Sequence, residues 1–236
     1  MSHWVASLLN ALDRADSANE AFAAVAEGAR AMGFEWCAYG SEHAVPFTRT
    51  DCFQISNYAE SWQARYAEAS YLLVDPTVIR AKQSIEPMVW NERDLRNAAQ
   101  FWDEARSFGL CHGWAQSCFD ARGSVGLLSL ARSHDPITDA ERRLKDPELR
   151  WLANVAHGAM SRYVVHTAQA RTPRLTRREV EVLRWTADGK SARQTAQILG
   201  IKKCTVDLHV ARSCIKLCAS SRSAAVAKAV AMGLLR

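Results

Sequence analysis

The feature that most constrains this chain is a reversal of charge near residue 170. Residues 1–170 hold 16 lysines and arginines against 21 aspartates and glutamates, a net charge of −5. Residues 171–236 hold 14 against 4, a net charge of +10. Because 236 residues exceed the usual length of one domain and fall short of three, we expect two domains. The basic second domain suits a polyanion such as DNA.

The boundary between the domains is predicted where helical periodicity fades. A helix is expected to end near Arg162, and the segment that follows carries Pro173, which breaks helices. We therefore expect a first domain at 1–164, a linker at 165–174 and a second domain at 175–236.

The first domain mixes strand and helix patterns. Short apolar runs typical of strands lie at 36–40, 52–56, 114–119 and 126–131. Between and before them are helical patterns such as 4–12 and 21–32. The mixture predicts a sheet covered by helices, so we expect an α+β chain whose first domain is an α-β-α sandwich.

The basic domain is predicted to be all-α. Thr176 and Glu179 form a capping box that starts one helix. Ser191 and Gln194 repeat the signal for a second, which Gly200 ends. A third helix, about 205–218, presents one stripe for burial, formed by Val206, Val210, Ser213 and Leu217. A short helix, a tight turn and another helix form the helix-turn-helix layout.

These residues resemble the LuxR-type DNA-binding domain over nearly the whole module. The likeness is carried by Leu175, Thr176, Glu179, Trp185, Gly189, Ile198, Gly200, Thr205, Val206, His209, Leu217 and Arg222. The resemblance implies a domain of four helices, in which the third reads DNA and the last, about 223–232, supports dimer contacts. The implied DNA-binding residues are Lys190, Arg193, Lys202, Lys203, Thr205, Asp207, Ala211, Arg212 and Lys216. Lys202 departs from the family, because a serine cap is common there.

The first domain resembles the autoinducer-binding domain of the same family, and it lacks the phosphorylatable-aspartate pattern of receiver domains. Residues that carry the likeness include Asn57, Tyr58, Trp62, Asp75, Pro76, Trp90 and Gly113. The resemblance implies an acyl-homoserine lactone as the signal ligand. The implied ligand-binding residues are Tyr58, Trp62, Tyr66, Asp75, Thr77, Trp90, Phe101, Trp102, Leu110 and Ser129.

The ligand's polar groups suggest a role for each implied anchor. An ionised Asp75 can accept from the amide N–H, and the indole of Trp62 can only donate, which suits the lactone carbonyl. Tyr58, helped by Ser129, can donate to the acyl carbonyl. A further hypothesis is that Trp114 faces the ligand and shortens the channel for its acyl chain.

We therefore expect a quorum-sensing transcription factor that binds an acyl-homoserine lactone and, as a homodimer, palindromic promoter DNA. RNA polymerase is a candidate partner. One alternative is a regulator of the same fold that is ligand-independent or senses a different small molecule. A remoter one is a lactone or acyl hydrolase using Ser129, His112 and Asp75, but no G-x-S-x-G elbow supports an enzyme.

The remaining expectations concern location and cofactors. No signal peptide or long apolar run is found, so we expect a cytoplasmic protein with no membrane partner. The seven cysteines, an odd number, include no CxxC pair and suit reduced thiols. Cys214, Cys218 and His209 lie close in sequence, but a fourth zinc ligand is not evident. We expect no metal and no cofactor.

Overall fold

The computed structural model describes residues 3–42, 52–90, 98–120, 124–168 and 173–235. The chain forms two compact units, each described by itself below. The first contains the strands and the helices up to Ala168, and the second contains the C-terminal helices.

A five-stranded antiparallel sheet forms the centre of the first unit. Its strands are β1 (Trp36–Glu42), β2 (Cys52–Ser56), β3 (Met88–Val89), β4 (His112–Phe119) and β5 (Val125–Arg132). Their order in the sheet is β2-β1-β5-β4-β3. The register places Ala38 opposite Ser129, and Gly40 opposite Leu127. The four predicted strands are confirmed; β3 was not predicted, because two residues give no periodicity.

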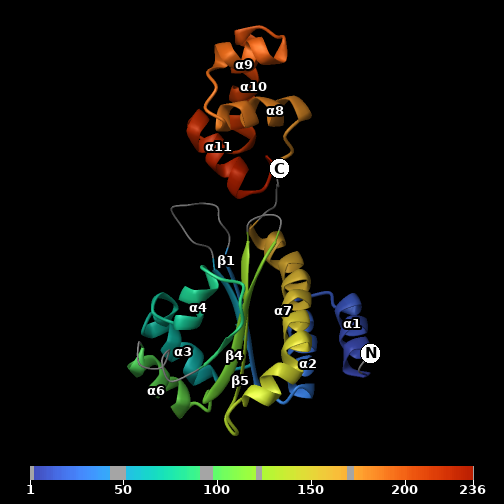
Figure 1. Cartoon of the computed structure of the whole chain (residues 1–236), viewed down its shortest axis with the longest axis vertical. Helices are drawn as coiled ribbons and strands as arrows, with labels where there is room; N and C mark the ends of the chain where they lie inside the picture. The colour runs from blue at the N-terminus through green and yellow to red at the C-terminus, as the bar shows by residue number, and fades with distance from the viewer. Residues whose placement is uncertain (1–2, 43–51, 91–97, 121–123, 169–172, 236) are drawn as a thin grey trace. The chain divides into compact units, whose positions relative to one another are not determined.

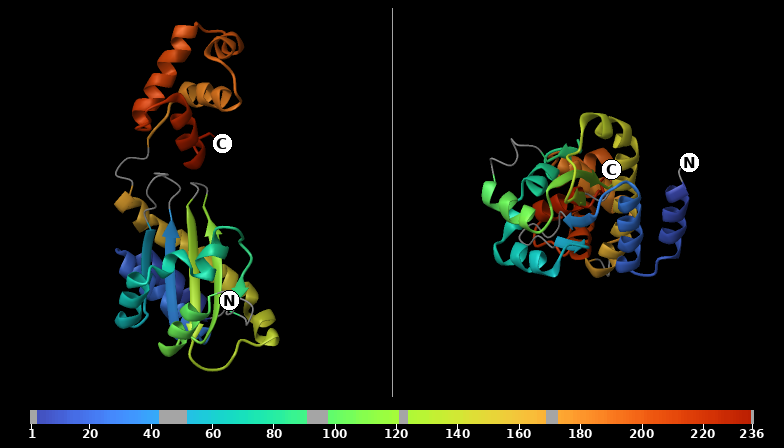
Figure 2. Two further views of the ribbon diagram at one scale, coloured as in Figure 1. Left: turned by 90° about the vertical axis from the view of Figure 1, so that its left-hand side faces the viewer. Right: turned by 90° about the horizontal axis from the view of Figure 1, so that it is seen from below.

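Helices cover both faces of this sheet, as Figures 1 and 2 show. One face carries α2 (Ala18–Ala31) and α7 (Asp139–Ala168), and α1 (His3–Arg14) packs against α2 on the outside of this layer. The other carries α3 (Glu60–Glu68), the 3-10 helix η1 (Tyr71–Leu73), α4 (Pro76–Ala81) and α6 (Ala99–Ser107). The predicted α-β-α sandwich is confirmed.

Helix α7 differs from the sequence prediction at its C-terminal end. It continues to Ala168 instead of ending near Arg162. No glycine or proline lies between Arg162 and Ala168, so this segment contains no helix-breaking residue. The residue limits of the domains and the linker stay a prediction.

Each face of the sheet has its own core because side chains alternate along a strand. Against α1, α2 and α7 lies a large apolar cluster that includes Tyr39, Trp114, Leu128 and Leu130. Against the opposite helices lies an aromatic cluster. Its members include Trp62, Tyr71, Phe101, Trp102 and Leu110, with Tyr58, Tyr66 and Trp90 packed against it.

The second unit contains four α-helices in its described part. They are α8 (Arg177–Ala187), α9 (Ala192–Leu199), α10 (Lys203–Lys216) and α11 (Arg222–Ala231). Both predicted capping boxes are present, and Gly200 ends α9 with a φ of 63°. The stripe predicted for burial on the third helix is buried, which confirms it. Helix α10 begins at Lys203, two residues before the predicted start, and its N-cap Lys202 makes no side-chain capping bond.

No helix in the described part of the chain is both long and apolar enough to cross a membrane.

Candidate functional site

A cavity of about 290 Å³ lies between the sheet and helices α3 and α4. The central strands place three small residues on it, Ala38 and Gly40 from β1 and Ser129 from β5. Small residues at these positions leave space that the helices above do not fill. The wall is completed by Tyr39, Gln54, Ile55, Ser56, Tyr58, Trp62, Gln63, Tyr66, Asp75, Thr77, Val78 and Leu127.

Asp75 is the buried carboxylate of this wall and the N-cap of α4, with Pro76 next to it at the first helical position. Its Oδ1 accepts hydrogen bonds from the Thr77 amide at 2.8 Å and the Thr77 hydroxyl at 2.7 Å. Its Oδ2 accepts one from the Tyr66 hydroxyl at 3.0 Å. Burial raises the pKa of Asp75, although the bonds from Thr77 and Tyr66 act to lower it.

Two tyrosines place hydroxyl groups on the same wall. Burial raises the pKa of Tyr58, which also shares a side-chain hydrogen bond with Ser129. Burial and the adjacent Asp75 raise the pKa of Tyr66. Both phenols therefore keep their protons at neutral pH, and each remains able to donate a hydrogen bond.

Aromatic side chains close the other end of the site. A smaller adjoining cavity of about 30 Å³ is bounded by Trp90, Phe101, Trp102, Ala105 and Leu110, together with residues of the first cavity. The rings of Trp90 and Trp102 lie 4.8 Å apart, as do those of Phe101 and Trp102. This composition, an apolar lining with a few polar groups, is typical of a small-molecule site.

An ion pair joins the helices that cover the cavity. Arg65 of α3 donates from Nε and Nη2 to the two carboxylate oxygens of Glu104 in α6, at 2.6 and 3.0 Å. These bonds hold the pKa of Glu104 at about 2. The fork-to-fork geometry fixes α3 against α6 and so fixes the aromatic residues between them.

The structure brings all ten residues expected to bind ligand around the two adjoining cavities. Sequence reasoning missed nine residues of the wall of the larger cavity: Ala38, Gly40, Tyr39, Gln54, Ile55, Ser56, Gln63, Val78 and Leu127. Strand alternation from Ser129 could have indicated the first two, had the register been known. The hypothesis about Trp114 is wrong, because this residue belongs to the apolar cluster on the opposite face of the sheet.

The second unit presents a basic surface around α9 and α10. Seven of the residues expected to bind DNA are exposed: Lys190, Arg193, Lys202, Lys203, Ala211, Arg212 and Lys216. Thr205 is partly buried. Asp207 pairs with Lys203 at 2.7 Å and with Arg222 at 3.3 Å.

Lys216 has a structural partner that was not expected. Its ammonium group donates to both carboxylate oxygens of Glu179, at 3.0 and 2.7 Å, and Glu179 is 2% exposed. Burial acts to raise the pKa of Glu179, but the bonds from Lys216 and Thr176 outweigh it and the pKa is lowered. Glu179, which completes the capping box of α8, is therefore also the anion that binds Lys216 and holds α10 in place.

Comparison with known proteins matches both units. Residues 17–160 match the autoinducer binding domain, and residues 173–229 match the bacterial regulatory proteins of the luxR family. This chain belongs to the LuxR family. The transcriptional activator protein AnoR of Acinetobacter nosocomialis is 37% identical over 100% of both chains. The crystal structure of Escherichia coli SdiA is 28% identical, has a TM-score of 0.79 and covers 99% of this chain and 98% of its own.

A second structure of this LuxR-family relative, SdiA in complex with octanoyl-rac-glycerol, has a TM-score of 0.81 and covers 99% of this chain and 95% of its own. The chain is thus a LuxR-type quorum-sensing regulator with an autoinducer-binding domain and a DNA-binding helix-turn-helix.

The three residues considered for a hydrolase, Ser129, His112 and Asp75, are not brought together around the cavities. Among the described residues that line them, Asp75 and Ser129 are present and His112 is not.

Proposed function

We propose that this LuxR-type regulator binds an acyl-homoserine lactone in its first unit and, as a homodimer, palindromic promoter DNA through its second. The observation that carries the proposal is the buried carboxylate of Asp75 in a cavity lined by aromatic residues. A carboxylate has about four lone-pair sites, and Oδ2 can accept from a ligand amide as well as from Tyr66. A ligand with one N–H donor beside an apolar chain fits such a site.

The other polar groups of the ligand have matching donors on the same wall. Tyr58 can donate to the acyl carbonyl beside Ser129, and the indole of Trp62 can donate to the lactone carbonyl. The acyl chain would then lie over Ala38 and Gly40, where the sheet offers no bulk. We infer that the ligand completes this core and stabilises the folded protein by RT ln(1 + L/Kd), where L is the free ligand concentration, so the stabilisation rises with the logarithm of L once L exceeds Kd.

DNA binding follows from the second unit. Two copies of α10 about 34 Å apart would read a two-fold site better than one, which favours a homodimer. Bacterial DNA lies in the cytoplasm, so this role places the protein there, where RNA polymerase is a candidate partner. We propose binding and not catalysis, so the ligand should be recovered intact.

The test is to express the full chain with acyl-homoserine lactones of short to long chain, with octanoyl glycerol, and with no addition. Soluble yield is measured first, and retained ligand is then identified by mass spectrometry. Recovery of an intact lactone supports the proposal. Recovery of octanoyl glycerol alone would point to a sensor of another acyl compound, and hydrolysed product would point to an enzyme.

Asp75→Asn provides the site-specific arm. Asparagine caps helices as well as aspartate through its one side-chain oxygen, so α4 should form, but an NH2 group then replaces Oδ2 and cannot accept from the ligand amide. We expect ligand affinity to fall about 10-fold or more. The matched control is Asp103→Asn on α6, whose side chain is 73% exposed and which should bind normally. Equal affinities for both variants would contradict the proposed role of Asp75.

A further inference from the structure

The outward face of α10 carries a continuous apolar stripe. Its members recur at helical spacing and are all exposed: Cys204, Leu208, Ala211 and Ile215. Leu208 is 47% exposed and Ile215 is 77% exposed. At about 100° per residue, this stripe lies opposite the buried stripe through Val206 and Val210. The centre of the surface that α10 offers to a partner is therefore apolar.

Charged side chains flank the stripe instead of interrupting it. Lys202 and Lys203 lie at its N-terminal end, and Arg212 lies along one side. Asp207, on the other side, is held by Lys203 and Arg222. The carboxylate that could accept from a cytosine amino group is thus engaged with cations of the same chain.

An apolar stripe between cations suits a DNA groove better than an apolar protein surface. The segment from residue 171 onward carries a net charge of +10, which favours a polyanion. In the major groove, guanine, adenine and cytosine present hydrogen-bonding edges, whereas thymine also presents a methyl group. Leucine and alanine side chains can contact that methyl group and can satisfy none of the hydrogen-bonding edges.

We propose that Leu208 and Ala211 read thymine methyl groups, so that each operator half-site carries thymine opposite the centre of α10. The proposal rests on the proposed function, because it requires α10 to enter the major groove. The residues near the N-terminal end of such a helix reach the bases. Ile215 lies about 10 Å further along the helix axis and should not reach them.

The experiment uses the full chain with its ligand. Binding sequences are selected from a random duplex pool, and each thymine of the selected site is then replaced by deoxyuridine, which removes only the methyl group. Dissociation constants are measured by fluorescence anisotropy at one salt concentration. Replacement at the contacted position should weaken binding about three- to fourfold in each half-site.

Two variants make the assignment specific. Leu208→Ala should bind the thymine site more weakly and lose its sensitivity to deoxyuridine, as a double-mutant cycle requires for a direct contact. Ile215→Ala, on the same stripe, should keep the full sensitivity. Because both side chains are exposed, neither variant should unfold the unit, and circular dichroism checks this.

The outcomes separate this inference from the proposed function. If no duplex is enriched, DNA binding itself fails. If a duplex is bound but every deoxyuridine site binds equally well, the thymine reading is overturned and DNA binding stands. If Leu208→Ala changes the sedimentation of the protein without changing the deoxyuridine effect, the stripe is a protein contact and the reading is again overturned.

Discussion

At the scale of single residues, the aromatic end of the cavity depends on a glycine. A Cβ added at Gly113 of β4 would lie 2.3 Å from Cε2 of Trp90. The backbone amide of Trp90 also donates to the Gly113 carbonyl at 2.9 Å, so the indole lies directly on the strand. Any larger residue at this position must displace the Trp90 ring, which bounds the smaller cavity.

Gly113→Ala should therefore lower the free energy of unfolding by about 1–3 kcal/mol through overpacking. It should also reduce ligand retention, because Trp90 would move. Urea unfolding and the amount of co-purified ligand measure the two effects. The matched control is Gly158→Ala in α7, where an added Cβ meets nothing within 4 Å among the described residues. That variant should gain about 0.5–1 kcal/mol, and an equal loss in both would refute the steric argument.

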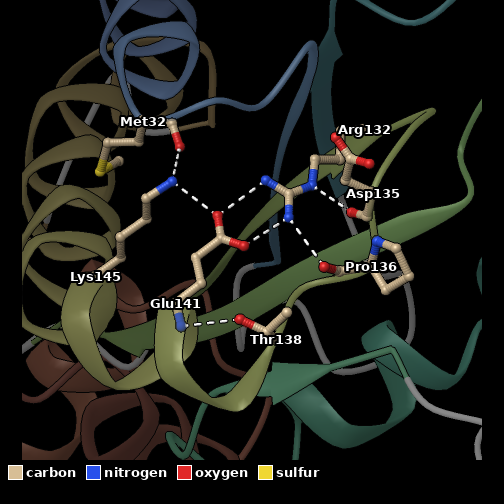
Figure 3. A network of polar contacts seen from close by, with 7 residues as sticks. All are labelled: Met32, Arg132, Asp135, Pro136, Thr138, Glu141 and Lys145. Atoms are coloured by element: carbon tan, nitrogen blue, oxygen red, sulfur yellow. Dashed lines mark hydrogen bonds and ion pairs between the residues drawn. The ribbon is translucent and has the colours of Figure 1, made fainter.

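At the scale of elements, an ionic network ties α2, β5 and α7 together (Figure 3). Arg132, at the end of β5, donates to both carboxylate oxygens of Glu141 in α7, at 2.9 and 2.7 Å. Lys145 donates to Glu141 at 2.8 Å and to the backbone carbonyl of Met32 at 2.7 Å. The side chains of Arg132 and Glu141 are 12% and 20% exposed, so solvent screens this pair less than a surface pair.

This network should make the stability of the first unit depend on pH. The bonds from Arg132 and Lys145 outweigh burial and hold the pKa of Glu141 at about 2, against an ordinary 4.5. A lowered pKa contributes stability that is present above the unfolded value and is lost as pH falls. We expect a loss of about 1–3 kcal/mol between about pH 5 and pH 2, measured by urea unfolding across that range.

Glu141→Gln should flatten that part of the pH profile and lower stability at neutral pH. Glu27→Gln serves as the control, since its side chain is 72% exposed and its partner Arg30 lies on the same helix. If the free energy of unfolding of Glu141→Gln fell with pH as steeply as that of the unaltered chain, other carboxylates would account for the pH dependence.

At the scale of the whole molecule, the two proposed roles, ligand binding and DNA binding, belong to segments of opposite net charge. The basic segment should release counterions when it binds DNA, so affinity should fall steeply as salt increases. Lys202 and Arg212 are exposed cations beside the reading helix. Lys202→Ala and Arg212→Ala should each reduce the slope of log affinity against log salt by about 1, as measured by anisotropy titrations.

Arg30→Ala in α2 removes the same charge from the acidic segment and should leave that slope unchanged. Its side chain is 55% exposed and pairs with Glu27 at 2.6 Å. If Lys202→Ala, Arg212→Ala and Arg30→Ala all reduced the salt slope equally, the net charge of the chain would govern DNA affinity, and the position of each cation would not matter.

The sequence determined the elements that local chemistry specifies. The capping boxes at Thr176 and Ser191 and the glycine at 200 set helix limits, because their hydrogen bonds join residues three or four apart. The four longer strands and the buried stripe of α10 followed from periodicity. The ten residues expected around the ligand came from the family resemblance, and their roles remain predictions.

The remaining features of the fold and the site follow from strand register and from helix packing. Trp114 occupies the core against α2 and α7, because alternation fixes a face only once the pairing of β4 with β5 is known. Ala38 and Gly40 open the cavity only because β1 lies beside β5 in register with Ser129. Lys216 meets Glu179 across 37 residues of sequence, and no local pattern records such a pair. Short-range hydrogen bonds are written in the sequence, whereas these contacts exist only after distant segments have packed.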